Sequence, residues 1–193
     1  MAAQTYMGYK KEGQKYLNRF ELDILPRYDY QVRDFTMKKT ISMEYGKNTV
    51  VICYEIENGM DETKLSITPL FDCRPYGITS EVAELSFKQK VEEQVLTLYP
   101  ENQEMEISFY ASEGEFVDRS KFPTSMAVPT HVIEGNEFYI VDNRTGFLGV
   151  DNHYTPYDVK LVLAPMEKKK FYLTCTVEKL SKRDGFEIAK EYK

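Results

Sequence analysis

The two histidines are the residues of this sequence with the most versatile chemistry. His131 lies in the alternating stretch THVIEG, which favours a hydrogen-bonded structural histidine. His153 lies in GVDNHYTP, a stretch rich in hydrogen-bonding side chains that we predict to be a loop. Neither has a Cys, Asp or Glu at a spacing typical of metal ligands. We therefore predict no metal site, and His153 is a candidate binding residue because loops often carry such groups.

The other groups that could act as nucleophiles or acids form no recognisable motif. Cys53, Cys73 and Cys175 are widely spaced and odd in number, which favours neither a disulfide framework nor a zinc knuckle. No GxSxG, HExxH, P-loop or dinucleotide-binding motif occurs. Carboxylates are plentiful, but most alternate with apolar residues, whereas glycoside hydrolysis needs two carboxyl groups about 5 to 10 Å apart with one pKa raised by burial. We predict no catalytic residue and no cofactor.

Charge and composition exclude several classes of function. Acidic residues exceed basic ones by 31 to 25, which gives a net charge of -6, and Lys and Arg form no long stripe of the kind that binds nucleic acid. The densest run, Lys168-Lys169-Lys170, is predicted to be a solvated hairpin turn. No segment resembles a signal peptide or a membrane span, so we expect no membrane partner. The unpaired cysteines favour a reducing, cytoplasmic location.

Apolar and polar residues alternate along most of the chain, which predicts β-strands. In MKKTISMEYGKNTVVICYEIEN, residues 37–58, two alternating runs flank Gly46-Lys47-Asn48, and this pattern predicts a β-hairpin. Similar runs separated by turn residues give about ten strands along the chain. Helical periodicity is weak before Gly185, and residues 81–90 fit either a short helix or a strand. We therefore predict an all-β fold, a large antiparallel β-sandwich with little helix.

The length of 193 residues fits one domain. We assign residues 1–180 to a single β-sandwich domain. The polar segment 181–193, SKRDGFEIAKEYK, can begin a helix beyond Gly185 and is interpreted as the start of a linker toward further chain.

An ordered set of motifs runs from residue 16 to residue 75. A Leu and a Phe precede a Pro-x-aromatic segment, a hairpin ending in G-x-N-T follows, and a later strand leads to a Pro and an Arg. The motifs are Leu17, Phe20, Pro26–Tyr30, Lys39–Met43, Gly46–Thr49, Tyr54, and Leu65 through Pro69 to Arg74. In this order and spacing they resemble the N-terminal domain of glycogen debranching enzymes of the bacterial and archaeal amylo-α-1,6-glucosidase type. A weaker likeness covers residues 144–180.

This resemblance implies a fold and a function. In the family a β-sandwich packs beside an α/α toroid that carries the catalytic carboxylates, so we expect a non-catalytic domain of an enzyme that hydrolyses α-1,6 branches of glycogen. The expected partners are that C-terminal catalytic domain of the same parent chain, beyond the linker at 181–193, and an α-glucan. Asp72, Arg74 and Tyr76 join His153 as candidate substrate-binding residues, because an aromatic face stacks on a sugar ring and Arg and Asp bond hydroxyl groups.

The sequence also departs from the family pattern. Pro75-Tyr76-Gly77 follows Arg74 where the family has Asp-x-His, and the family's Gly-rich opening segment, its later Trp and its toroid are absent from these 193 residues. Two other interpretations stay open. One is a free-standing carbohydrate-binding β-sandwich, favoured by the richness in Tyr. The other is a structural or interaction protein, which predicts an exposed apolar patch.

Overall fold

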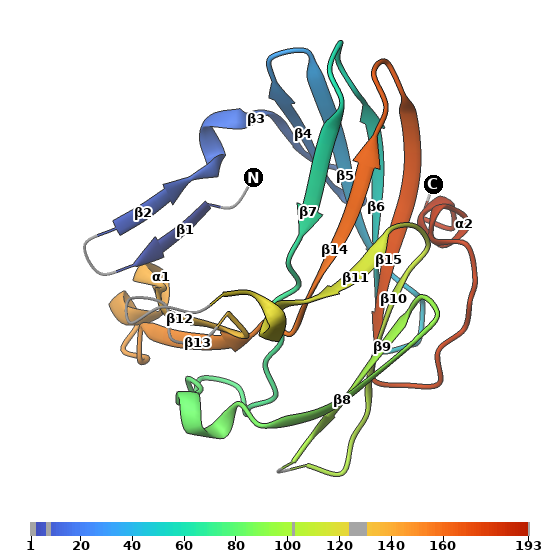
Figure 1. The fold of residues 1–193 in the computed structure, drawn as a ribbon. Coiled ribbons are helices and arrows are strands. Elements are labelled where there is room, and N and C mark those ends of the chain that lie inside the picture. Colours follow the sequence, from blue (N-terminus) through green and yellow to red (C-terminus); the bar gives the residue numbers. More distant parts are fainter. Residues whose placement is uncertain (1–2, 7–8, 102, 124–130, 193) are drawn as a thin grey trace.

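An eight-stranded antiparallel sheet is the largest element of the computed structural model, which describes residues 3–6, 9–101, 103–123 and 131–192 (Figure 1). Neighbouring strands that follow each other in the chain form hairpins, whereas β6, β15 and β10 are brought together from distant segments. In order across the sheet the strands are β3 (Leu17–Leu22), β4 (Pro26–Val32), β5 (Phe35–Met43), β6 (Thr49–Glu57), β15 (Lys168–Thr176), β10 (Ile107–Ala111), β9 (Val95–Pro100) and β8 (Phe87–Glu92).

Two smaller antiparallel sheets complete the fold. A three-stranded sheet crosses the face of the large sheet, and a four-stranded sheet lies beside one end of these two layers (Figure 1). The first contains β11 (Glu115–Asp118), β14 (Tyr157–Leu163) and β7 (Thr63–Ile67), and the second contains β13 (Val150–Tyr154), β12 (Ile133–Phe138), β1 (Ala3–Tyr6) and β2 (Tyr9–Glu12). The prediction of an all-β antiparallel sandwich with little helix is confirmed.

The core lies between the three-stranded sheet and the large sheet. Along β14, Leu161 and Leu163 are buried while Val162, which lies between them, is 58% exposed, so one face of this strand is apolar and packs inward. The large sheet supplies the opposing layer, where the rings of Tyr54 and Phe171 stack with centroids 4.9 Å apart. Both inner faces are apolar because burying them removes hydrocarbon surface from water.

The hairpin predicted for residues 37–58 is confirmed as β5 and β6. The turn is closed by the Glu44 amide, which donates to the Thr49 carbonyl at 2.9 Å. Gly46 has a φ of +72° there, a conformation that a residue with a side chain rarely adopts. Met43 consequently pairs with Val50, and this register sets which side chains of both strands face the core.

The run Lys168-Lys169-Lys170 lies in β15, so the prediction of a hairpin turn there is wrong. The turn precedes it, and the Glu167 amide donates to the Ala164 carbonyl at 3.1 Å. The lysines are tolerated in a strand because acidic residues stand opposite them on β6: Lys168 Nζ lies 3.0 Å from Glu57, and Lys170 Nζ lies 2.5 Å from Glu55.

Five short helices occur among the described residues, one of them in the segment whose sequence was ambiguous. Residues 81–90 divide into a 3₁₀ helix and the start of β8, so both interpretations hold in part. The short helices are η1 (Gly13–Tyr16), η2 (Val82–Glu84), η3 (Arg119–Lys121), α1 (Ile140–Arg144) and α2 (Gly185–Lys190). No helix among the described residues is long and apolar enough to cross a membrane.

The helix expected beyond Gly185 is confirmed as α2, and it packs on the outer face of the large sheet. The Asp184 carboxylate caps it by accepting from the Phe186 amide at 2.7 Å. Ile188 is 1% exposed and covers Val51 and Cys53. Residues 185–190 therefore contribute to the packing of this domain, and the division at residue 180 with a linker beyond it stays a prediction.

Leu163 and Val162 provide a matched test of the sandwich, because they are neighbours on β14 and face opposite ways. Leu163→Ala should lower the free energy of unfolding by about 2–5 kcal/mol, since it leaves a cavity between the two sheets. Val162→Ala should change it by no more than about 0.5 kcal/mol. Urea unfolding of both variants measures the difference, and equal losses would contradict the assignment of the core.

Candidate functional site

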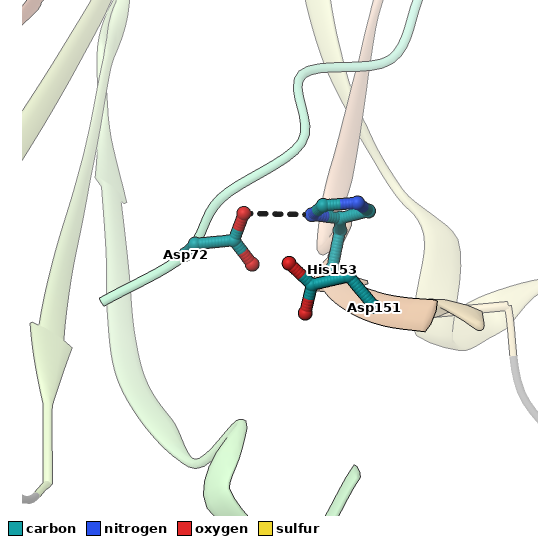
Figure 2. Close-up of side chains that lie close together, drawn as sticks. All are labelled: Asp72, Asp151 and His153. Atoms are coloured by element: carbon teal, nitrogen blue, oxygen red, sulfur yellow. Dashed lines mark hydrogen bonds and ion pairs between the residues drawn. The ribbon is translucent and has the colours of Figure 1, made fainter. Parts of the chain in front are cut away.

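The loop after β7 is held against β13 by a pair of backbone hydrogen bonds. The amides and carbonyls of Phe71 and Tyr154 bond each other reciprocally, both at 2.9 Å. Asp72 follows Phe71 and His153 precedes Tyr154, so this pairing places the two side chains side by side (Figure 2). A contact between residues 81 positions apart in the sequence thus depends on one local backbone bridge.

His153 is a buried imidazole surrounded by acidic and phenolic oxygens. Its Nδ1 lies 2.7 Å from Asp72 Oδ2, and its Nε2 lies 2.9 Å from the Tyr139 hydroxyl and 3.5 Å from Glu137 Oε2. Burial alone would lower the pKa of His153, but the hydrogen bond and negative charge of Asp72, with the charges of Asp151 and Glu137, raise it above the ordinary value. The site therefore favours the charged imidazole.

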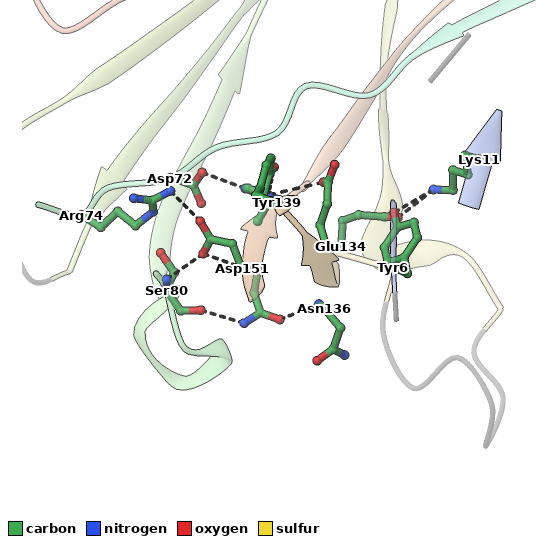
Figure 3. Close-up of polar contacts among 12 residues, drawn as sticks. Tyr6, Lys11, Asp72, Arg74, Ser80, Glu134, Asn136, Tyr139 and Asp151 are labelled. Atoms are coloured by element: carbon green, nitrogen blue, oxygen red, sulfur yellow. Dashed lines mark hydrogen bonds and ion pairs between the residues drawn. The ribbon is translucent and has the colours of Figure 1, made fainter. Parts of the chain in front are cut away.

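Asp151 is the most buried carboxylate of this region, with 1% of its surface exposed. Arg74 Nη2 donates to its Oδ2 at 2.5 Å, and the backbone amides of Ser80 and Asn152 donate to its Oδ1 at 2.7 and 2.9 Å. These bonds compensate the cost of burying the charge. They also fasten the loop of residues 74–80 to β13 (Figure 3).

The polar contacts continue from β13 to the edge of the four-stranded sheet (Figure 3). Glu134 on β12 accepts from Lys11 Nζ at 2.7 Å and from the Tyr6 hydroxyl. Burial would raise the pKa of Glu134, but these two donors outweigh it and the pKa is lowered. These contacts join β12 to β1 and β2, while Glu137 joins β12 to His153 on β13, so the network spans the four-stranded sheet and reaches the loop after β7.

Asp72, Asp151 and His153 place one potential metal-ligand atom each within 4.8 Å of one another. A metal ion bound by all three would compete with Arg74 Nη2, which already lies beside Asp151. The prediction from sequence spacing could not include this group, since Asp72 is remote from the other two along the chain. We interpret the group as an ion-pair network in which Arg74 and His153 supply the positive charge.

The four candidate substrate-binding residues divide into two groups. Asp72, Arg74 and His153 lie in one network and bond either each other or Asp151. Tyr76 stands apart: it is 93% exposed, and its ring meets that of Phe147 edge to face, with centroids 6.1 Å apart. Their contact with substrate stays a prediction.

His153 itself lies in strand β13, so its predicted place in a loop is wrong. The turn-like composition of GVDNHYTP led to the wrong prediction of a loop, because its polar side chains form hydrogen bonds within the network rather than with water. Sequence reasoning also missed Asp151 and Tyr139. The signal for Asp151 was its i, i+2 spacing from His153, which puts both on one face of a strand.

His131 has the hydrogen-bonded structural role expected from the sequence. His131 Nε2 lies 2.7 Å from the Pro123 carbonyl, and the His131 carbonyl accepts from Arg119 Nε at 2.7 Å. Cys53 and Cys175 lie in β6 and β15, and all three cysteines are free. Burial raises the pKa of Cys53 to about 12 and that of Cys175 to about 11, so both thiols stay protonated at neutral pH.

The comparison that decides the family covers most of the chain. Residues 1–170 match the family model described as glycogen debranching enzyme N terminal. The chain belongs to this family. The resemblance found in residues 16–75 is thereby confirmed. The network and α1 lie within the matched part of this debranching-enzyme N-terminal domain, whereas β15 continues past residue 170 and α2 lies beyond it.

The domain has a distant likeness to a protein of known structure. No curated protein sequence matches the debranching-enzyme domain. Among solved structures, a human-microbiome protein described as a kojibiose phosphorylase is 8% identical with a TM-score of 0.39. The match covers 98% of this chain and 23% of that one, so the domain spans about a quarter of the length of that protein.

The charged state of His153 should make the stability of the domain depend on pH. Its folded pKa lies above the unfolded value of about 6.5, so its stabilising contribution is complete below that pH and is lost as pH rises through the folded pKa. His153→Gln should remove this contribution, so the difference in free energy of unfolding between the native protein and the variant should shrink as the pH rises above about 6.5.

Asp72→Asn is the matched second variant, because it removes the nearest negative charge and keeps the imidazole. It should lower the folded pKa of His153, which NMR titration of the imidazole measures directly. A pH profile of His153→Gln parallel to that of the native domain would contradict the assignment.

Proposed function

We propose that the chain is a non-catalytic N-terminal domain of a cytoplasmic glycogen debranching enzyme that hydrolyses α-1,6 branches. In this proposal the sandwich supports an α/α-toroid catalytic domain of the same parent chain and borders its glucan site. The family match over residues 1–170 carries the proposal. The three free thiols are the observation that favours a reducing compartment.

The pairing of three carboxylates with cations favours a structural rather than a catalytic role. Asp151 is paired with Arg74, Asp158 accepts from Arg119 Nη1 at 2.9 Å, and Glu134 accepts from Lys11. A general acid in glycoside hydrolysis needs a raised pKa, whereas the pKa of Glu134 is lowered by its donors. The ion pairs with Arg74, Arg119 and Lys11 thus give these carboxylates a structural role.

The chain alone should therefore release no glucose from a branched limit dextrin. The gene read beyond the codon for Lys193 should encode a helical domain with acidic pairs, and the parent protein should hydrolyse the same dextrin. Reducing-sugar release measures both. Hydrolysis by the 193-residue chain, or a parent gene without such a helical region, would overturn the proposed function.

Exposed apolar side chains around α1 provide a surface for the proposed catalytic domain. Val141 is 67% exposed, Leu148 is 69% exposed, and both lie close in sequence to Phe147, which contacts the exposed Tyr76. Apolar groups gathered in this way are typical of interaction sites. We infer that the toroid docks here, next to the network that contains Arg74.

Leu148→Ser should test this docking, because it removes an exposed apolar side chain from the proposed interface. It should weaken binding of the parent's separately expressed catalytic domain roughly tenfold, as calorimetry would measure. Val162→Ser is the matched control, since Val162 is similarly exposed on the three-stranded sheet. Equal affinities for the two variants would place the interface elsewhere.

A further inference from the structure

A groove of about 560 Å³ lies beside the polar network, and Arg74 is not among the residues that line it. Its volume falls within the roughly 300–1,000 Å³ of typical ligand sites. Its wall combines aromatic rings with charged and hydroxyl groups from four parts of the fold: Tyr30, Lys39, Thr68, Arg119, Glu134 and Tyr139. The groove shares Glu134 and Tyr139 with the network described above (Figure 3).

Tyr30 and Lys39 line one side of this groove, and Tyr28 lies next to both without lining it. On β4 the rings of Tyr28 and Tyr30 are nearly parallel, at 11°, with centroids 6.3 Å apart. Lys39 Nζ on β5 lies 4.5 Å from the Tyr28 centroid and 5.8 Å from that of Tyr30. Aromatic surface beside hydrogen-bond donors suits a ligand that has apolar CH faces and many hydroxyl groups.

Lys39 differs from the other two cations of the groove. Lys11 is paired with Glu134, and Arg119 is paired with Asp158. Within the part of the chain that the structure describes, Lys39 has no carboxylate at ion-pair distance, and burial lowers its pKa. Its ammonium donors are thus left for a bound molecule.

The groove offers hydrogen-bond donors and acceptors together. Lys11, Lys39 and Arg119 line it with Glu134 and Glu137, so its charges nearly balance. A neutral polyhydroxyl ligand suits this mixture, since its hydroxyls can accept from Lys39 and donate to the glutamates.

We propose that this groove binds a short α-linked glucan segment, with Lys39 donating to its hydroxyl oxygens and Tyr30 contacting a sugar face. The choice of an α-glucan rests on the proposed function. The site lies apart from Asp72, Arg74 and Tyr76, and it would hold a glucan chain on the domain while hydrolysis takes place on the parent's catalytic domain.

Lys38 and Lys39 provide a matched pair of variants, because they are neighbours on β5 and line hollows on opposite faces of the large sheet. Maltopentaose should bind the native chain saturably in calorimetry. Lys39→Met should weaken this binding roughly tenfold or more, the effect of losing a charged hydrogen bond. Lys38→Met should leave the dissociation constant unchanged within about twofold, and circular dichroism should show that both variants fold.

Three results would overturn the proposal. Equal binding of maltopentaose by the two lysine variants would place any glucan site outside the groove. No saturable binding by the native chain at low-millimolar concentrations would exclude a glucan site. Binding of inorganic phosphate that is lost in Lys39→Met, without binding of maltopentaose, would make the groove an anion site. The proposed non-catalytic role is tested separately, because only hydrolysis of the branched dextrin by the chain alone would contradict it.

Discussion

The reciprocal backbone bonds between Phe71 and Tyr154 determine how the four-stranded sheet sits on the sandwich. Each of the two side chains is anchored in the core: Phe71 meets Phe109 edge to face, and Tyr154 stacks on Phe87 with centroids 4.7 Å apart. The polar network and the groove both depend on this attachment, because their residues come from both sides of it. A small sheet that could not bury its own face alone is thus held by two aromatic anchors and one backbone bridge.

Charge compensation is the second constraint on this region. Asp151 and Glu134 lie at opposite ends of the network, and each has a cation and further donors in contact. Removing Arg74 would leave the buried charge of Asp151 without a cation, which costs more than the pair itself contributes. These ion pairs therefore fix the geometry of the loop and of β12. Because Lys11 and Arg119 are already paired, Lys39 is the cation of the groove that is available to a ligand.

The strands could be predicted where the alternation of apolar and polar residues lies within one stretch of sequence. Alternation along β5, β6, β14 and β15 identified the strands, because one face of each is buried and the other is not. The lysine run at 168–170 was misassigned because its compensating acids stand on a different strand, which local composition does not reveal.

The candidate site was only partly predictable, for a related reason. Asp72 and Arg74 were selected from one loop and His153 from another segment, and the structure brings them together. The groove was missed because Lys39 and Tyr30 alternate with other residues as in any strand. Their meeting with Arg119 and Glu134 depends on how three sheets are arranged, and pairings between distant strands leave no pattern in a single sequence.

The eight-stranded sheet is open, since it ends at β3 and β8 and, among the described residues, no further strand pairs with either. Such edges offer free backbone groups to other polypeptides and promote aggregation. Here Arg19 on β3 and Lys88 and Lys90 on β8 are exposed, and their charge disfavours the approach of another strand. Colloidal stability at the flanks of the molecule thus depends on residues that contribute nothing to its core.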